Sequence, residues 1–158
     1  MHAVCPDKKN GDFVKTAVHD FEGDKTYSEK LGHRFKLNFD FNSVDENQYD
    51  RLIIPGGRSP EYLRLNQRVI QIVSHFLDKN KPIASICHGS QILISTGKIK
   101  GRSMTCYPGV CSDLIMSGVN YIDIGIEDAY VDGNLVTAKA WPSHVKWIQK
   151  FIELLSKS

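Results

Sequence analysis

A cysteine and a histidine stand side by side where a predicted strand runs into a predicted helix, in the segment 84–89, which reads Ala-Ser-Ile-Cys-His-Gly. A side chain at such a bend is forced out of the sheet and points over the amide end of the following helix. The helix dipole and the free N–H groups there favour a thiolate, so the pattern indicates Cys87 as a nucleophile. Neighbours in sequence usually point apart, so adjacency alone does not pair His88 with the thiol. The alternative is an inert buried thiol beside a polar residue that begins a helix.

A second candidate segment, 55–61, reads Pro-Gly-Gly-Arg-Ser-Pro-Glu. The glycines Gly56 and Gly57 let backbone N–H groups turn toward a ligand. In an open parallel sheet, ligands gather at the carboxyl ends of strands, so this loop and Cys87 should face one crevice and could form an oxyanion hole. A double glycine serves an ordinary strand-to-helix turn equally well. Glu61 has its own structural explanation, as an acid that complements the dipole of the next helix.

The elements that would position these residues follow from hydrophobic patterning. Short apolar runs at Leu52–Ile54 and Pro82–Ile86 predict strands buried on both faces. A helix is predicted from Ser59, as its cap, to about Asp78, and another from Gly89 to Thr96 with a stop at Gly97. The remaining expectations are a strand tail at His2–Cys5, a strand with Phe35, Leu37, Phe39 and Phe41 on one face, strands at Arg102–Tyr107 and Tyr121–Gly125, a helix at Val110–Ser117, a hairpin at Val131–Leu135, and a helix at Pro142–Leu155 with Val145, Ile148, Phe151, Ile152 and Leu155 on its buried face. Alternating strands and helices predict a three-layer α/β fold.

Length and composition limit the number of domains, the class of partner and the cellular location that we expect. A chain of 158 residues with 41% apolar residues predicts one domain, residues 1–158. Twenty basic and eighteen acidic residues leave a formal charge of +2 that is dispersed along the chain, which makes nucleic acid and anionic membranes poor partners. There is no secretory pattern and no apolar run of membrane-spanning length, so we expect a cytoplasmic protein, with nucleus or organelle left open.

The cysteines Cys5, Cys87, Cys106 and Cys111 include no Cys-x-x-Cys pair and no histidine spacing of a zinc site. We therefore expect reduced thiols and no metal site.

Several motifs together resemble one known superfamily. They are L-I-I-P-G-G-R-S-P-E-Y-L-R at 52–64, A-S-I-C-H-G-S-Q-I-L at 84–93, T-C-Y-P-G at 105–109, D-G-N-L-V-T at 132–137 and A-W-P at 140–142. The chain resembles the DJ-1/PfpI superfamily, which is class I glutamine amidotransferase-like, over nearly its whole length. The segment 20–30 and the Trp141-Pro142 pair are most similar to plant DJ-1 homologues.

The resemblance implies a flavodoxin-like three-layer sandwich with a mostly parallel sheet and Cys87 as nucleophile. The backbone N–H groups of Gly57 and His88 would be the oxyanion donors. Gly56 and Arg58 would take part in oxyanion or substrate binding. Tyr107, at the end of a predicted strand, could line the crevice, but a buried tyrosine at such a position is commonly structural. In the PfpI branch, the glutamate matching Glu61 approaches the catalytic histidine from a neighbouring subunit, which implies a homo-oligomer (a dimer, trimer or hexamer).

The implied activity is that of a cofactor-free glyoxalase, which converts methylglyoxal to lactate, or of a deglycase that acts in carbonyl stress. One alternative is a PfpI-type intracellular cysteine peptidase whose triad of Cys87, His88 and Glu61 assembles across subunits. Another is a non-catalytic redox sensor or chaperone-like stress protein that responds to oxidation of Cys87.

One family feature has no match in this sequence. Family members begin with a βα unit that carries a glutamate within hydrogen-bond reach of the cysteine, and Met1 falls after the corresponding position. We therefore expect an N-terminally incomplete domain with the first βα unit absent and with aldehyde isomerisation weakened or abolished. Another subunit, the missing piece in trans or a closing-up of the sheet would have to fill the gap.

Overall fold

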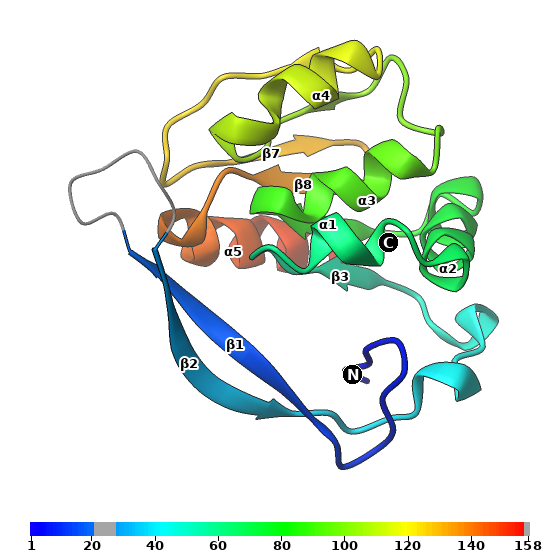
Figure 1. Cartoon of the computed structure of the whole chain (residues 1–158). Coiled ribbons are helices and arrows are strands. Elements are labelled where there is room, and N and C mark those ends of the chain that lie inside the picture. Colours follow the sequence, from blue (N-terminus) through cyan, green and yellow to red (C-terminus); the bar gives the residue numbers. More distant parts are fainter. Residues whose placement is uncertain (21–27, 157–158) are drawn as a thin grey trace. The chain divides into compact units, whose positions relative to one another are not determined.

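The computed structural model describes residues 1–20 and 28–156, which separate into two compact units, Met1–Asp45 and Glu46–Ser158 (Figure 1). Most of the segment 20–30, singled out above as plant-like, lies outside the described residues. That the whole chain forms one domain stays a prediction.

The first unit is built on an antiparallel hairpin of β1 (Phe13–Asp20) and β2 (Ser28–Lys36), followed by a 3-10 turn, η1 (Phe41–Ser43). The prediction of a strand through Phe41 is wrong beyond Lys36, and His2–Cys5 is irregular rather than a strand. The chain turns at Asp40, because its carboxylate accepts the N–H of Asn10 at 2.5 Å and its carbonyl accepts the N–H of Ser43.

The second unit contains a four-stranded sheet in the order β3 (Leu52–Ile54), β4 (Ile83–Ile86), β8 (Leu135–Ala138), β7 (Ala129–Asp132). The first three strands are parallel and β7 is antiparallel to β8, which confirms a mostly parallel sheet. The hairpin prediction is also confirmed, with Gly133 at φ +55° in its turn. The carboxyl ends of β3 and β4 lie together, because the parallel register pairs Ile54 with Ser85.

The strands predicted at 102–107 and 121–125 are shorter in the structure. They form a parallel pair of two-residue strands, β5 (Ser103–Met104) and β6 (Asn120–Tyr121).

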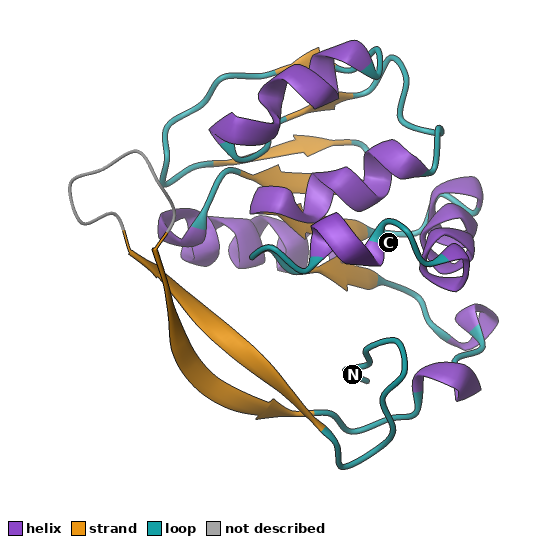
Figure 2. Ribbon diagram, in the orientation of Figure 1, coloured by secondary structure: helices purple, strands orange, loops and turns teal. Residues whose placement is uncertain are grey.

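Helices cover both faces of the sheet (Figures 1 and 2). One side carries α1 (Pro60–Leu63), α2 (Gln67–Asp78), α3 (Ser90–Ser95) and α4 (Cys111–Met116), and α5 (His144–Leu155) lies on the other. Short 3-10 turns precede or join them at Glu46–Gln48, Cys87–Gly89, Pro108–Val110 and Trp141–Ser143. This is the three-layer arrangement that the sequence predicted.

One continuous helix from Ser59 to Asp78 is not formed. Asn66 leaves helical geometry, and its side-chain oxygen accepts the N–H groups of Arg68 and Val69 at 3.0 and 3.1 Å. Satisfying two of the free donors at a helix start makes Asn66 a strong cap, so α2 begins anew after it. Ser59, the predicted cap of α1, makes no such side-chain bond.

The core beneath α5 contains Ala84, Ile86, Val136, Trp147 and Phe151 in one buried cluster. Two expectations fail on this side of the sheet. The predicted buried face of the last helix is confirmed at Phe151 and wrong at Val145, Ile148 and Ile152, which are 79%, 37% and 56% exposed. Trp147 lies beside Phe151 against the sheet instead. The middle strand residue Ile53 is 38% exposed, so β3 is not buried on both faces.

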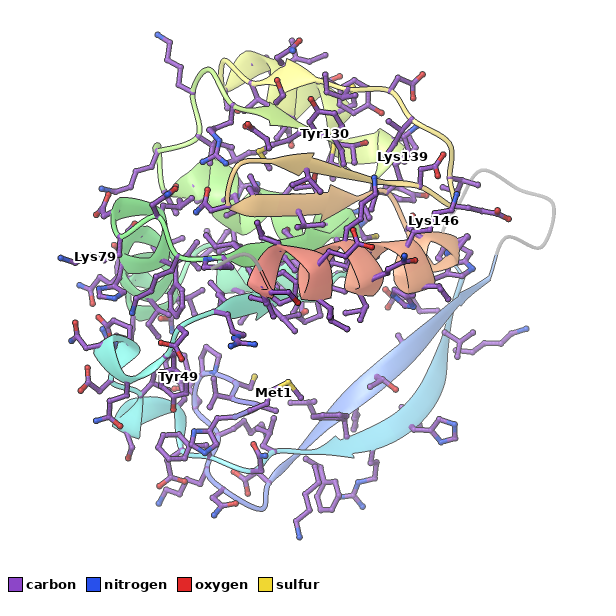
Figure 3. All side chains as sticks on the ribbon, turned by 180° about the vertical axis from the view of Figure 1, so that it is seen from behind. Met1, Tyr49, Lys79, Tyr130, Lys139 and Lys146 are labelled. Carbon is purple, nitrogen blue, oxygen red and sulfur yellow. The ribbon has the colours of Figure 1, made fainter. Side chains whose placement is uncertain are left out.

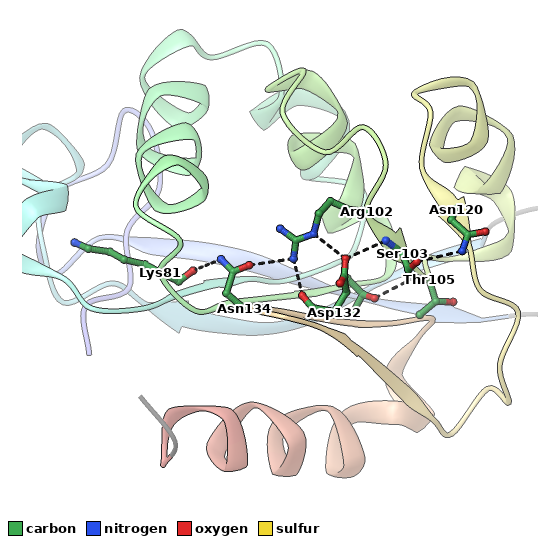
Figure 4. Close-up of polar contacts among 8 residues, drawn as sticks. Lys81, Arg102, Ser103, Thr105, Asn120, Asp132 and Asn134 are labelled. Carbon is green, nitrogen blue, oxygen red and sulfur yellow. Dashed lines mark hydrogen bonds and ion pairs between the residues drawn. The ribbon is translucent and has the colours of Figure 1, made fainter.

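A polar network fixes the opposite end of the sheet from the cysteine (Figure 4). Arg102 Nε donates to Asp132 Oδ2 at 2.7 Å, and its Nη2 donates to Asn134 Oδ1 at 3.0 Å. The same Asp132 oxygen accepts the N–H of Ser103, and Asn134 Nδ2 donates to the carbonyl of Lys81 at 2.8 Å. The network therefore ties β5 to the turn between β7 and β8.

Candidate active site

Cys87 lies at the end of β4 with φ +60°, a left-handed conformation that is uncommon for a residue with a side chain. Ile86 before it is extended, and Ser90 after it already begins α3. Two donors hold the strained peptide, since the carbonyl of Cys87 accepts the N–H of Tyr107 at 3.4 Å and the hydroxyl of Ser90 at 3.3 Å. The thiol is thereby turned out of the strand.

Ser90 was missed as a site residue. Its position three residues after the cysteine, in the first helical turn, suits a serine that bonds back to the carbonyl of residue i−3. That pattern was a usable signal, since the Ser90 side chain is buried and contacts the cysteine backbone.

The loop after β3 comes into close contact with Cys87. A Cβ placed on Gly56 would lie 2.6 Å from the Cβ of Cys87 and 3.3 Å from its Sγ. Gly57 adopts φ +80°, which favours glycine, and its N–H is directed at the thiol. The double glycine therefore does more than form a turn, because it lets the backbone approach the sulfur.

The pKa of the Cys87 thiol reflects two opposing effects, burial and hydrogen bonding. Burial raises the pKa of the Cys87 thiol above its ordinary value, although hydrogen bonds from the N–H groups of Gly57 and His88 lower it. Desolvation wins because the charged form loses water at this position. Burial therefore outweighs the N–H donors at the helix end, which lower the pKa of this thiol as the sequence pattern indicated.

His88 turns back toward the thiol despite being adjacent in sequence. Its Nδ1 lies 3.3 Å from Cys87 Sγ. The buried imidazole stacks on the ring of Tyr107, with centroids 4.8 Å apart and an interplanar angle of 24°. Tyr107 therefore lies in the site, where it fixes the plane of the histidine ring. The structure brings Cys87, His88 and Tyr107 together.

Glu61 and Arg58 lie on the neighbouring helix start and engage each other. Arg58 Nη2 is 3.6 Å from Glu61 Oε2, and both side chains are partly exposed. An approach of Glu61 to His88 of another subunit remains a prediction.

Three buried side-chain oxygens near this end of the fold have no hydrogen-bond partner among the described residues: Ser85 Oγ, Gln91 Oε1 and Thr105 Oγ1. Within residues 1–20 and 28–156, no group of three or more His, Cys, Asp or Glu side chains could hold a metal ion. In the same part of the chain, no helix has the length and apolar character needed to cross a bilayer.

The comparison that decides the family is a family-model match, described as the DJ-1/PfpI family, over residues 8–154. The chain belongs to the DJ-1/PfpI family. Protein DJ-1 homolog D of Arabidopsis thaliana is 50% identical over 156 residues, which are 98% of this chain and 40% of that protein. Deglycase PfpI of Pyrococcus furiosus is 40% identical over 126 residues, which are 80% of this chain and 74% of that protein.

Solved structures of the family support the fold. The ThiJ/PfpI domain protein from Brachyspira murdochii superposes with a TM-score of 0.72 at 23% identity, covering 80% of this chain and 72% of that one. At that identity the likeness bears on the fold alone. The chain spans only 40% of the Arabidopsis protein.

Proposed function

We propose that this DJ-1/PfpI member is a cysteine-dependent enzyme that acts on reactive carbonyls, with Cys87 as the nucleophile. The proposal rests on the surroundings of Cys87 Sγ. The N–H groups of Gly57 and His88 lie beside this sulfur, and the His88 imidazole Nδ1 is 3.3 Å from it. A relative with 40% identity is named a deglycase, which agrees with carbonyl chemistry.

The chemistry begins from the neutral thiol. In the tautomer with its proton on Nε2, His88 Nδ1 accepts the thiol proton as Cys87 Sγ bonds to the aldehyde carbon of methylglyoxal. The carbonyl electron pair moves to oxygen, where the N–H groups of Gly57 and His88 stabilise it before it takes a proton. The product of this step is a hemithioacetal on Cys87.

The second half of the reaction moves one hydrogen. A base removes the C1 proton of the hemithioacetal and C2 receives a proton, which converts the adduct to a thioester of lactate. Water then attacks the thioester, the C–S bond breaks, and lactate leaves with the thiol restored. Methylglyoxal and one water become one lactate, so no electron donor is needed. His88 becomes neutral again when it gives the thiol proton to the alkoxide oxygen, and its Nδ1, 3.3 Å from Cys87 Sγ, would then serve as this base.

A deglycase would start from the adduct of methylglyoxal with an amine or thiol and release the same lactate. The glyoxalase and deglycase activities differ in which species, free aldehyde or adduct, determines the initial rate. With a preformed hemithioacetal of N-acetylcysteine as substrate, the initial rate of lactate formation by a glyoxalase should follow the concentration of free aldehyde, whereas that of a deglycase should follow the concentration of the adduct.

In the peptidase alternative, Glu61 must leave its ion pair with Arg58 and contact His88 of another subunit. Arg58→Gln would then raise peptidase activity by freeing the acid. Unchanged or absent peptide cleavage in that variant would argue for the carbonyl activity.

A further inference from the structure

Two cysteines other than the nucleophile lie at the two ends of one tight turn. Cys106 comes shortly after β5 and Cys111 begins α4, with Tyr-Pro-Gly-Val between them. The N–H of Val110 donates to the carbonyl of Tyr107 at 2.9 Å. The N–H of Cys111 donates to the carbonyl of Pro108. Two consecutive bonds of this 3-10 type curl the chain and bring the ends of the turn toward each other.

The electrostatic effects of the two thiols agree with this closeness. Burial raises the pKa of the Cys106 thiol to about 12, and the negative charge of an ionised Cys111 contributes to the increase. Burial also raises the pKa of Tyr121, and both thiols add to that increase. Charge interactions weaken with distance and are screened by water, so groups that shift each other's pKa lie close together. We call Cys106, Cys111 and Tyr121 the thiol cluster.

The thiol cluster lies at the same edge of the sheet as the nucleophile. The Tyr121 hydroxyl contacts the amine of Lys139, which is labelled in Figure 3 and directly follows β8. In the parallel register, the last residue of β8 pairs with Ile86, the residue before Cys87. Chemistry at the thiol cluster therefore takes place beside the active site.

The two thiols of the cluster differ in their access to solvent. Cys106 has no exposed surface, whereas Cys111 is partly exposed. An oxidant in solution reaches the partly exposed sulfur first, because the buried one offers no path for attack. A second thiol close to an oxidised cysteine can convert it to a disulfide. Cys111 thus has the position of the thiol that is oxidised, and Cys106 that of the thiol that resolves it.

Cys106 is joined to the active-site peptide by two contacts. The Ser90 hydroxyl donates to the Cys87 carbonyl at 3.3 Å and also contacts the Cys106 thiol. The next residue, Tyr107, donates its N–H to the same carbonyl at 3.4 Å and stacks on the His88 imidazole. A movement of Cys106 therefore acts on both donors that hold the strained Cys87 peptide.

We propose that Cys106 and Cys111 form a disulfide when the chain meets a hydroperoxide, and that this disulfide slows the chemistry of Cys87. With hydrogen peroxide, the Cys111 sulfur attacks one peroxide oxygen, the O–O bond breaks, and a sulfenic acid and one water form. The Cys106 sulfur then attacks the Cys111 sulfur. Hydroxide leaves and takes the Cys106 thiol proton, which gives the disulfide and a second water. The two thiols lose two electrons, and the peroxide gains them.

The disulfide changes the surroundings of the nucleophile. The short S–S bond draws the Cys106 sulfur toward Cys111 and away from the Ser90 hydroxyl. Tyr107 then shifts on the His88 ring, so the imidazole loses its fixed plane. Lactate formation should fall, and dithiothreitol should restore it by reducing the bond. That fall in activity rests on the proposed function, whereas the disulfide itself does not.

Peptide mass spectrometry tests the disulfide without any substrate. The whole chain is treated with hydrogen peroxide, unfolded in urea with N-ethylmaleimide present, and digested with trypsin, which leaves both cysteines in one peptide, 103–139. This peptide should carry no label and should be lighter than the reduced peptide by two hydrogen atoms. Dithiothreitol before labelling should restore a label on each cysteine. A label on both cysteines after peroxide treatment would overturn the proposal.

Three variants control for the other thiols. Cys5→Ser and Cys87→Ser each remove a thiol outside the pair, and both should form the disulfide as the parent chain does. Cys111→Ser should leave Cys106 fully labelled. A disulfide that requires Cys87, or loss of the Cys106 label in Cys111→Ser, would contradict oxidation through Cys111.

Alkylation of Cys87 by iodoacetamide tests the coupling to the active site. After peroxide treatment, Cys87 of the parent chain should react at least about five-fold more slowly than Cys87 of Cys111→Ser treated in the same way. Direct oxidation of Cys87 occurs in both chains, so the difference between them reports the effect of the disulfide. Equal rates in the two chains, with the disulfide verified in the parent, would overturn the coupling. Because this readout needs no lactate, it separates a failure of the coupling from a failure of the proposed function.

Discussion

The Cβ that an alanine would add at Gly56 meets the Cβ of Cys87 at 2.6 Å, so this glycine sets how closely the β3 loop approaches the reactive thiol. Real Cβ atoms do not approach so closely, and neither partner is the end of a flexible side chain. Gly56→Ala should therefore push the loop and the cysteine apart, lowering the free energy of unfolding by about 1–3 kcal/mol and the rate of Cys87 alkylation at least about ten-fold as the donors move off the sulfur.

Gly109→Ala is the matched control for that substitution. An added Cβ there would lie 3.3 Å from the ring of Tyr107, a contact that a small ring movement relieves. Thermal unfolding and peptide-resolved iodoacetamide labelling of Cys87 should change little. Equal losses in both variants would show that the close approach of Gly56 has no special role.

The reactivity of Cys87 should rise steeply with pH. Burial raises the pKa of its thiol above the ordinary value of 9.0, so the thiolate fraction is small at neutral pH and increases through a pKa higher than 9.0. Alkylation measured from pH 6 to 11 should still be increasing at pH 9. A plateau below pH 8 would mean a resting thiolate and would contradict the burial argument.

The sequence was sufficient to place Cys87 at the bend and the glycine loop beside it, because both follow from local patterns and from the parallel order of strands. The orientation of His88 could not be predicted, since it depends on stacking with Tyr107, which lies nineteen positions later in the chain. The raised pKa of Cys87 depends on burial, and burial is a property of the assembled fold.

The buried face of α5 shows another limit of pattern analysis. Both seams repeat at helical spacing, so periodicity alone gives no reason to choose between Val145–Ile152 and Trp147–Phe151. The larger aromatic pair takes the core position because it removes more apolar surface from water. The helix break at Asn66, in contrast, was visible in the sequence as a good capping residue.

The Arg102 network should contribute measurable stability. Arg102→Met removes the hydrogen bonds to Asp132 and Asn134 and leaves their oxygens half-buried, which should cost about 1–3 kcal/mol in urea unfolding. Lys98→Met is the comparison, because its ion pair with Asp78 is exposed and should be worth less than about 0.5 kcal/mol. Equal effects would contradict a special role for the network.

Cys106 should destabilise the fold at alkaline pH. Its side chain has no exposed surface, and burial raises its pKa to about 12 from 9.0. The unfolded chain loses this proton first, so the stability that the neutral thiol gives is complete below about pH 9 and is lost as the pH rises toward 12, by up to about 1.4 kcal/mol per pH unit.

Cys106→Ala should make unfolding free energy less steeply dependent on pH in that range. Val110→Ala, also buried, should lower stability equally at every pH and keep the parent slope. If the Cys106 variant retains the parent slope, its thiol is not the buried neutral group described.

The central claim is that Cys87 adds to a carbonyl substrate, and one assay tests it most directly. The purified chain is incubated with methylglyoxal in the absence of glutathione, and lactate is quantified beside Cys87→Ser and, as a thiol control, Cys111→Ser. Lactate is expected from the parent chain and from Cys111→Ser, with at least a hundred-fold loss in Cys87→Ser. Lactate formation that survives Cys87→Ser, or its absence from a folded parent chain, would contradict Cys87 as the nucleophile that adds to methylglyoxal.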